Sequence, residues 1–127
     1  MSKEKLSIAE IVAIGSDPSA KYALSTAHPM YAKGAIMAGL EYKANNKDTV
    51  FEVMYYGEAL FGLIEDEDLI ELVGLAKEAG VRILACENAI EKLEIDKAKL
   101  PSNVEFVSNS FIYFFGLQEL GYRVMSV

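Results

Sequence analysis

The 127-residue sequence has no tryptophan, only one histidine and only one cysteine, Cys86. A single cysteine can form neither a disulfide within the chain nor a Cys-x-x-Cys redox pair. Zinc catalysis uses three or more protein ligands, so a zinc centre within one chain lacks donors. A magnesium site made only of carboxylates stays open, but we predict no metal and no cofactor.

Positive charge is also scarce: 12 Lys and Arg stand against 19 Asp and Glu, which gives a net charge of −7. This balance argues against binding to nucleic acid or to an anionic membrane surface, because both need clustered cations. No apolar run approaches the ~18 residues of a membrane span. Residues 1–5 precede an apolar stretch without a small-residue cleavage signature, so we expect no signal peptide. A cytoplasmic protein with a reduced thiol is the expectation.

Apolar residues are abundant, at 52% of the chain, and predict one domain over residues 1–127 with a full core. Apolar runs bounded by turn residues predict five strands. These are residues 6–14, 50–56, 81–86, 104–107 and 122–127. Amphipathic segments between them predict helices at residues 20–27, 30–44, 59–64, 69–79, 88–93 and 111–120. Gly15-Ser16-Asp17-Pro18 is the predicted turn after the first strand. Alternation without hairpin signals is typical of an α/β fold with a parallel sheet and helices on both faces.

An acidic run and an apolar helix are the two segments with an unusual composition. The acidic run Glu65-Asp66-Glu67-Asp68 precedes helix 69–79 and is interpreted as helix capping and solvation, because it lacks the spacing of a calcium loop. The helix 111–120 is apolar on nearly every side. We predict that its second face meets another subunit, since so small a domain cannot bury both faces. Cover by a loop is the alternative.

Cys86 ends a predicted buried strand and leads directly into a helical turn. In parallel α/β sheets, ligands bind outside the carboxyl ends of the strands. Backbone N–H groups of the following turn can stabilise a thiolate there. The neighbouring Glu87 would oppose this unless its side chain points away. The alternative is that Cys86 is a small buried hydrophobe. A Cys-His pair would need His28, for which no third partner is visible.

Other strand ends supply candidate pocket residues. Gly15–Ser16 and residues 108–110 are candidate pocket residues. We also predict Tyr56, Gly57, Glu58 and Asn88 as substrate-binding residues. Each has a structural alternative: packing for Tyr56, a turn for Gly57, solvation for Glu58 and a local cap for Asn88.

Three segments carry a resemblance to a known family. These are Val-Met-Tyr-Tyr-Gly-Glu-Ala-Leu at 53–60, Ala-Gly-Val-Arg-Ile-Leu-Ala-Cys-Glu-Asn-Ala-Ile at 79–90, and 104–107 with Leu-Gln-Glu-Leu-Gly-Tyr at 117–122. The chain resembles the DsrE/DsrF-like family, small α/β proteins that include the sulfur-relay TusBCD subunits and YchN-type proteins. Residues 25–31, Ser-Thr-Ala-His-Pro-Met-Tyr, depart from the family pattern.

The resemblance implies a three-layer α/β/α fold with a five-stranded, mostly parallel sheet, and a homotrimer or homohexamer. It also implies that Cys86 accepts a persulfide in exchange with sulfur donor and acceptor proteins. Our first hypothesis is therefore a sulfur carrier or sulfurtransferase-like subunit with Cys86 as the catalytic residue. The alternative is a non-catalytic oligomeric binding module in which Cys86 is a core residue. A weaker third hypothesis is a cysteine-dependent hydrolase or reductase that uses His28.

Overall fold

The computed structural model describes residues 5–16 and 20–127. Residues 1–4, where the segment considered as a signal peptide begins, and Asp17 and Pro18 of the predicted turn lie outside the described residues. The elements are α1 (Ile8–Gly15), β1 (Tyr22–Thr26), α2 (Pro29–Asn45), β2 (Phe51–Tyr55), α3 (Ala59–Glu65), α4 (Glu67–Ala79), β3 (Val81–Cys86), α5 (Glu87–Lys92), the 3₁₀ turn η1 (Lys97–Lys99), β4 (Val104–Val107), α6 (Ser110–Glu119) and β5 (Arg123–Ser126).

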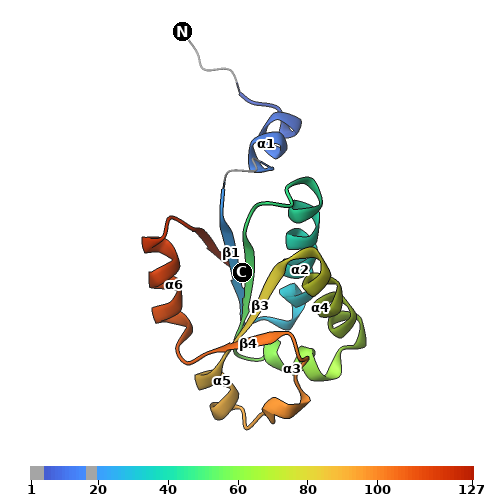
Figure 1. The fold of residues 1–127 in the computed structure, drawn as a ribbon, viewed down its shortest axis with the longest axis vertical. Helices are drawn as coiled ribbons and strands as arrows, with labels where there is room; N and C mark the ends of the chain where they lie inside the picture. The colour runs from blue at the N-terminus through green and yellow to red at the C-terminus, as the bar shows by residue number, and fades with distance from the viewer. Residues whose placement is uncertain (1–4, 17–19) are drawn as a thin grey trace.

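The described strands form one five-stranded sheet in the order β4-β3-β2-β1-β5, and each neighbouring pair runs parallel. Helices α2 and α4 lie on one side of the sheet and α6 lies on the other (Figure 1). The chain steps from β1 to β4 in one direction. Helix α6 then crosses the opposite face and places β5 beside β1. The predicted three-layer α/β/α fold is confirmed.

The predictions for residues 6–14 and 20–27 were wrong. Most of the predicted strand 6–14 lies in helix α1, and the predicted helix 20–27 contains strand β1. The Ser7 hydroxyl accepts the N–H of Glu10 at 3.1 Å, while the Glu10 carboxylate accepts the N–H of Ser7 at 2.8 Å. This capping box has the sequence signature Ser-x-x-Glu, which favours a helix start over a strand. Residues 22–26 instead pair with both β2 and β5.

The remaining elements agree closely with their predicted ranges, because strong local signals mark their ends. Strands β3 and β4 have the predicted bounds. The Asp66 carboxylate caps α4 by accepting the N–H groups of Asp68 and Leu69, at 3.1 and 3.3 Å. Gly80 ends the same helix at a φ of +82°, in the left-handed region that glycine adopts without strain.

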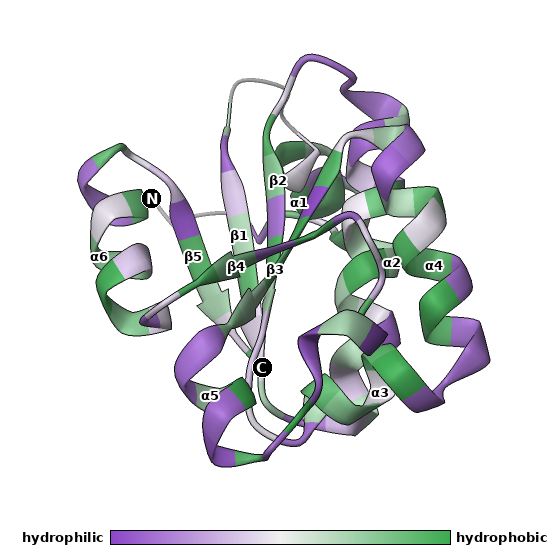
Figure 2. Ribbon diagram, turned by 60° about the horizontal axis from the view of Figure 1, so that its bottom comes forward, coloured by the Kyte–Doolittle hydropathy of each residue, from purple (hydrophilic) through white to green (hydrophobic). Residues whose placement is uncertain are grey.

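The two faces of the sheet bury very different amounts of apolar surface. On the face covered by α2, α3 and α4 there is one large core, which includes Ile36, Val53, Leu60 and Leu63. On the α6 face, the buried apolar cluster consists of Met54, Leu84 and Cys86. The middle strands carry hydrophobic colour, and the outer side of α4 is hydrophilic (Figure 2). The single cysteine therefore lies on the sparsely packed side of the sheet.

Candidate functional site

Cys86 is the last residue of β3, an inner strand, and stands immediately before α5. Its side chain belongs to the cluster on the α6 face, where Tyr56 from the end of β2 and Phe114 from α6 pack around it. The residue is 6% exposed. The carboxyl end of a parallel strand is where α/β proteins bind ligands, so the structure places the thiol at the predicted edge of the sheet.

The polar groups around the sulfur favour the thiolate. Burial raises the pKa of Cys86, because a charged group loses solvation inside the protein. The backbone N–H groups of Ala89, Ser110 and Asn88, together with the Ser110 hydroxyl, act in the opposite direction. Their combined effect is larger, and the pKa of Cys86 lies below the ordinary thiol value. These donors come from the starts of two helices, α5 and α6, which meet beside the end of β3.

The carboxylate of Glu87, which could oppose a thiolate at Cys86, is paired with a lysine. Glu87 forms an ion pair with Lys97, and Lys97 also lies over the ring of Phe106, 4.3 Å from its centroid. The Glu87 side chain is therefore held by the η1 segment. The backbone of this region is fixed by the N–H of Asn88, which donates to the carbonyl of Ser108 at 3.3 Å. This hydrogen bond joins the segment after β3 to the segment after β4.

A small hollow of about 70 Å³ lies next to the cysteine cluster. Its lining includes Met54 of that cluster, Tyr56 and Phe114, which pack against the cluster, and Ser110, which acts on the thiol. Ser25 and Ser126 complete its polar side, and their hydroxyl oxygens are 2.8 Å apart. The volume suits a group of a few atoms, such as one sulfur atom with a water molecule. Ser110 therefore both lines the hollow and lowers the pKa of Cys86, whereas the sequence offered it only as one of the candidates 108–110.

The predicted substrate-binding residues fall into different surroundings. Tyr56 lines the hollow beside Cys86, while the exposed side chain of Asn88 lines a separate hollow of about 360 Å³ with Glu91 and Lys97. Gly57 has a φ of +56°, and a Cβ placed on it would lie 3.0 Å from the Cβ of Ala27. The turn and this close approach explain the glycine. Only Tyr56 and the backbone of Asn88 lie with the thiol.

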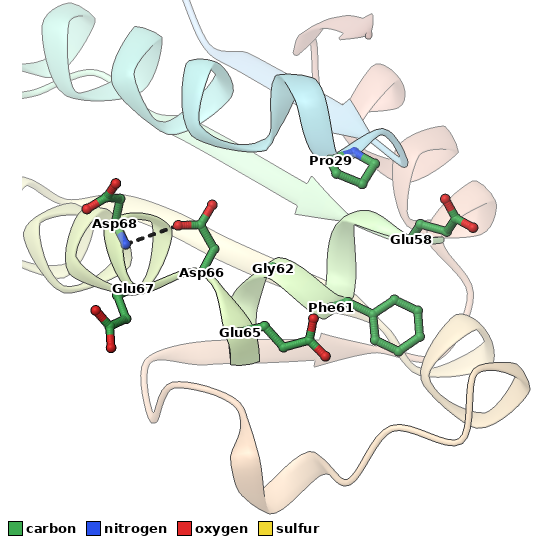
Figure 3. A pocket seen from close by; sticks show the side chains of 8 residues that line it. All are labelled: Pro29, Glu58, Phe61, Gly62, Glu65, Asp66, Glu67 and Asp68. Atoms are coloured by element: carbon green, nitrogen blue, oxygen red, sulfur yellow. Dashed lines mark hydrogen bonds between the residues drawn. The ribbon is translucent and has the colours of Figure 1, made fainter.

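Glu58 lines a hollow of about 970 Å³, which opens between the start of α2 and helices α3 and α4 (Figure 3). The acidic run 65–68 also lines this hollow. Within the run, the Asp66 carboxylate caps α4 and lies 3.7 Å from the Lys33 ammonium. Helix capping and solvation account for these carboxylates, as predicted. Within residues 5–16 and 20–127, no group of three or more His, Cys, Asp or Glu side chains is placed to hold a metal ion.

The observed position of the first strand removes Gly15 and Ser16 from the candidate pocket residues. They do not lie at the carboxyl end of a strand. The residue that ends β1 is Thr26, whose hydroxyl accepts the N–H of His28 at 3.1 Å. His28 in turn caps α2, since its Nδ1 accepts the N–H of Met30 at 3.2 Å. The single histidine therefore has a structural task at the start of a helix.

Sequence reasoning missed a buried carboxylate on the α6 face. Glu52, the second residue of β2, is 2% exposed and accepts hydrogen bonds from the hydroxyls of Tyr113 and Tyr122, the latter at 3.1 Å. The Arg82 guanidinium lies 3.9 Å from the same carboxylate. A glutamate inside an otherwise apolar strand was the available signal, because carboxylates are almost never buried without partners.

The comparisons agree on the fold. The protein of unknown function MTH1491 from Methanobacterium thermoautotrophicum is 19% identical, with a TM-score of 0.72 over 85% of this chain and 97% of that one. The ychN protein from E. coli is 8% identical, with a TM-score of 0.67 over 85% and 98%. BT1422 from Bacteroides thetaiotaomicron, also of unknown function, is 13% identical, with a TM-score of 0.61 over 86% and 96%. No curated protein sequence matches the chain.

Two further findings bear on the kind of protein. Along the part of the chain that is described, none of the helices combines the length and apolar character needed to span a membrane. The model of the DsrE/DsrF-like family matches residues 13–127, which is nearly the whole chain. The chain belongs to the DsrE/DsrF-like family.

Proposed function

We propose that Cys86 accepts sulfane sulfur as a persulfide and passes it to a second thiol, so that the protein is a sulfur carrier or sulfurtransferase-like subunit. The observation that carries this proposal is the set of N–H and hydroxyl donors around the sulfur, which lowers the pKa of Cys86 despite burial. A thiolate is the nucleophilic form of cysteine. Family membership supports the same reading, because the family includes sulfur-relay proteins.

The transfer needs no cofactor. The Cys86 thiolate attacks the outer sulfur of a donor persulfide, R–S–SH. A new bond forms between Sγ and that sulfur, the donor's S–S bond breaks, and the donor leaves as the thiolate R–S⁻. The proton stays on the transferred sulfur or is lost to water, and no external oxidant or reductant is used. A thiolate of an acceptor protein attacks the outer sulfur in the same way and regenerates Cys86.

The direct test is intact-mass measurement after incubation with a persulfide donor. We expect the wild-type chain to gain one sulfur atom, about 32 Da, and to lose it on reduction. The Cys86→Ser variant should gain nothing. An equal gain in Cys86→Ser, or no gain in the wild type, contradicts the proposal.

The donors around the sulfur can be tested through the pH dependence of alkylation. The pKa of Cys86 is lowered, so the rate of alkylation should reach half its maximum at a lower pH than for a free thiol. Removing the hydroxyl in Ser110→Ala should move that midpoint upward while leaving the backbone donors in place. Ser108→Ala, which changes a neighbouring exposed serine, is the matched control and should leave the midpoint unchanged.

The same proposal includes a cytoplasmic homotrimer or homohexamer that exchanges sulfur with donor and acceptor proteins. Helix α6 supports a subunit contact, because Phe111, Ile112 and Phe115 are 60–68% exposed. Exposed apolar side chains on adjacent turns of one helix are typical of interfaces. Phe115→Lys should lower the mass measured by analytical ultracentrifugation, whereas Lys92→Ala on α5 should not.

A second candidate, an oligomeric binding module, is favoured by one observation. Cys86 is 6% exposed and packs with Met54 and Leu84 in a buried cluster. If the thiol is only a core residue, it should resist alkylation in the native protein at every pH and react after denaturation. Rapid reaction of the native thiol excludes this candidate.

A further inference from the structure

Helix α1 is a well-formed helix whose side chains are all exposed. Its capping box between Ser7 and Glu10 fixes its start. Yet α1 contains no buried residue. Its exposed apolar side chains are Ile8, Ile11, Val12 and Ile14. The helix projects away from the rest of the domain along the longest axis (Figure 1). Residues 8–12 also precede the segment matched by the family model.

An eight-residue helix does not hold its structure alone in water, because isolated helices shorter than about 12–15 residues are marginal. The stability of such a helix comes from packing an apolar face against something else. The four exposed aliphatic side chains of α1 would otherwise remain in contact with water. The helix therefore requires a covering surface, and its own domain does not provide one in this arrangement.

The domain has an apolar hollow of about 390 Å³ that is partly open to solvent. It lies on the α2 face at the β5 edge of the sheet, and its lining includes Leu24, Ala38, Tyr42, Phe51 and Met125. In the sheet, Met125 is in register with Leu24, so both side chains point to the face that α2 covers. Met125 is 60% exposed. In a layered α/β domain, a helix is the element that covers such a strip.

Helix α1 cannot cover the hollow of its own chain from its present position. Gly15, at the end of α1, lies at the rim of that hollow. The next residue is held there, because the side-chain amide of Asn46 donates to the carbonyl of Ser16 at 2.7 Å. From this anchor the helix runs outward. Its length of about 12 Å, at 1.5 Å per residue, carries its apolar side chains away from its own hollow.

We propose that α1 of one copy of this chain packs into the apolar hollow between α2 and β5 of a second copy, and that the two copies exchange their helices reciprocally. The charges are complementary, because Glu10 is the only charged residue of α1 and Arg123 lines the hollow. A reciprocal exchange uses the same two surfaces twice and closes at two copies. This contact is separate from the proposed α6 contact and does not depend on sulfur transfer.

Cysteine cross-linking between differently tagged chains tests the exchange. Full-length Ile11→Cys is mixed with full-length Met125→Cys and oxidised mildly, with native Cys86 present in both. We expect a cross-linked dimer of mixed tags, at a yield at least tenfold above the control mixture of Ile11→Cys with Leu75→Cys. Leu75 is exposed on α4 and does not line the hollow.

Three results would overturn the proposal. The first is an intramolecular bridge in the chain that carries both Ile11→Cys and Met125→Cys, with no cross-linking in the mixture. The second is a dimer linked through Ile11→Cys in both copies, at a higher yield than the mixed dimer. The third is a yield no higher than the Leu75→Cys control.

Hydrogen exchange provides a second readout that needs no cysteine variant. The amides of α1 in the wild-type protein should be protected, since a covered helix opens rarely. A charge in the hollow, Met125→Glu, should reduce this protection at least tenfold, whereas Leu75→Glu should leave it unchanged. Unprotected α1 amides in the wild type, or equal effects of the two variants, contradict the exchange.

Discussion

The two faces of the sheet differ in what they bury. On the α2 and α4 face, aliphatic side chains such as Ile36, Leu60 and Leu63 are fully removed from water. On the α6 face, the sheet presents a carboxylate, Glu52, and a thiol, Cys86, to a single helix. The first face is a hydrophobic core in the ordinary sense. The second is a thinner layer in which polar groups are held by specific hydrogen bonds.

This difference shows how a small domain can place its apolar core and its buried polar groups on opposite faces of one sheet. Burial of apolar area is the main favourable term in folding, and here it is concentrated on one side of the sheet. The other side holds the thiol of Cys86 and the polar groups that lower its pKa. We expect substitutions on the α2 face to change the free energy of unfolding strongly. Those on the α6 face should have smaller effects that depend on hydrogen bonds.

The largest expected effect is Leu60→Ala in α3. Leu60 is fully buried, so truncation leaves a cavity and should lower the free energy of unfolding by about 2–5 kcal/mol. Leu120→Ala, which truncates an exposed leucine just after α6, should change it by less than about 0.5 kcal/mol. Urea unfolding of both variants measures the contrast. Equal losses would mean that the two faces do not differ as described.

Next in size is Tyr113→Phe, which removes a hydroxyl that donates to the buried Glu52 carboxylate. A hydrogen bond to a charged group contributes about 1.5–3 kcal/mol, so a loss of this order is expected. Protection of the α6 amides against hydrogen exchange should fall in parallel, because this bond holds the helix to the sheet. Tyr122→Phe is the matched control and should have the smaller effect, since its bond is longer at 3.1 Å and it lies outside α6.

Two glycine substitutions compare the packing around α2 with the packing around α6. In α2, a Cβ on Gly39 would lie 2.8 Å from Cδ1 of Phe51 and 3.2 Å from Cγ1 of Val81. Gly39→Ala should therefore destabilise the protein by about 1–3 kcal/mol through overpacking. In α6, nothing lies within 4 Å of a Cβ on Gly116.

The expected sign is opposite at that second glycine. Gly116→Ala should stabilise the separated chain by about 0.5–1 kcal/mol, because alanine is the better helix former. Thermal unfolding at low protein concentration measures both variants. A gain at Gly39 would contradict the tight packing of the α2 face. A loss at Gly116 that appears only in the assembled protein would indicate a subunit contact there.

The smallest effect is expected for Glu105→Gln on the edge strand β4. Arg82 donates two hydrogen bonds to this carboxylate, at 2.7 and 2.8 Å, but both side chains are about half exposed. Such a pair contributes at most about 0.5–1 kcal/mol. Arg82 lowers the pKa of Glu105, so the contribution is present at neutral pH. It is lost progressively as the pH falls from the ordinary carboxyl value of 4.5 through the lower pKa of the folded protein. Unfolding of both proteins at pH 7 and pH 3 should show a larger difference at pH 7 than at pH 3.

Much of the fold followed from local signals. The strands 81–86 and 104–107 were predicted with their observed bounds, because glycine or turn residues bracket short β-branched runs. The start of the chain was misassigned because residues 6–14 were interpreted by their apolar content, and the Ser7–Glu10 capping signature was overlooked. That error moved the predicted end of the first strand from Thr26 to Gly15.

The candidate site was predicted in part. Cys86 at a strand end could be recognised from one stretch of sequence, as could Tyr56 at the neighbouring strand end. The role of Ser110 depends on α6 beginning beside α5, a contact between segments 24 residues apart in the printed sequence. Glu58 was grouped with the thiol because it follows a neighbouring strand, but its side chain lines the acidic hollow on the α2 side.

The sequence by itself determined which segments become strands and helices from residue 28 onward, and that a single thiol ends one of the strands. These properties depend on periodicity, caps and glycines, which act within a few residues. Tertiary structure alone decided that the thiol faces α6, that Glu52 is buried beneath two tyrosines, and that α1 is left uncovered. Each of these depends on how far-apart segments pack, because burial and the donors around a charge belong to the assembled layers.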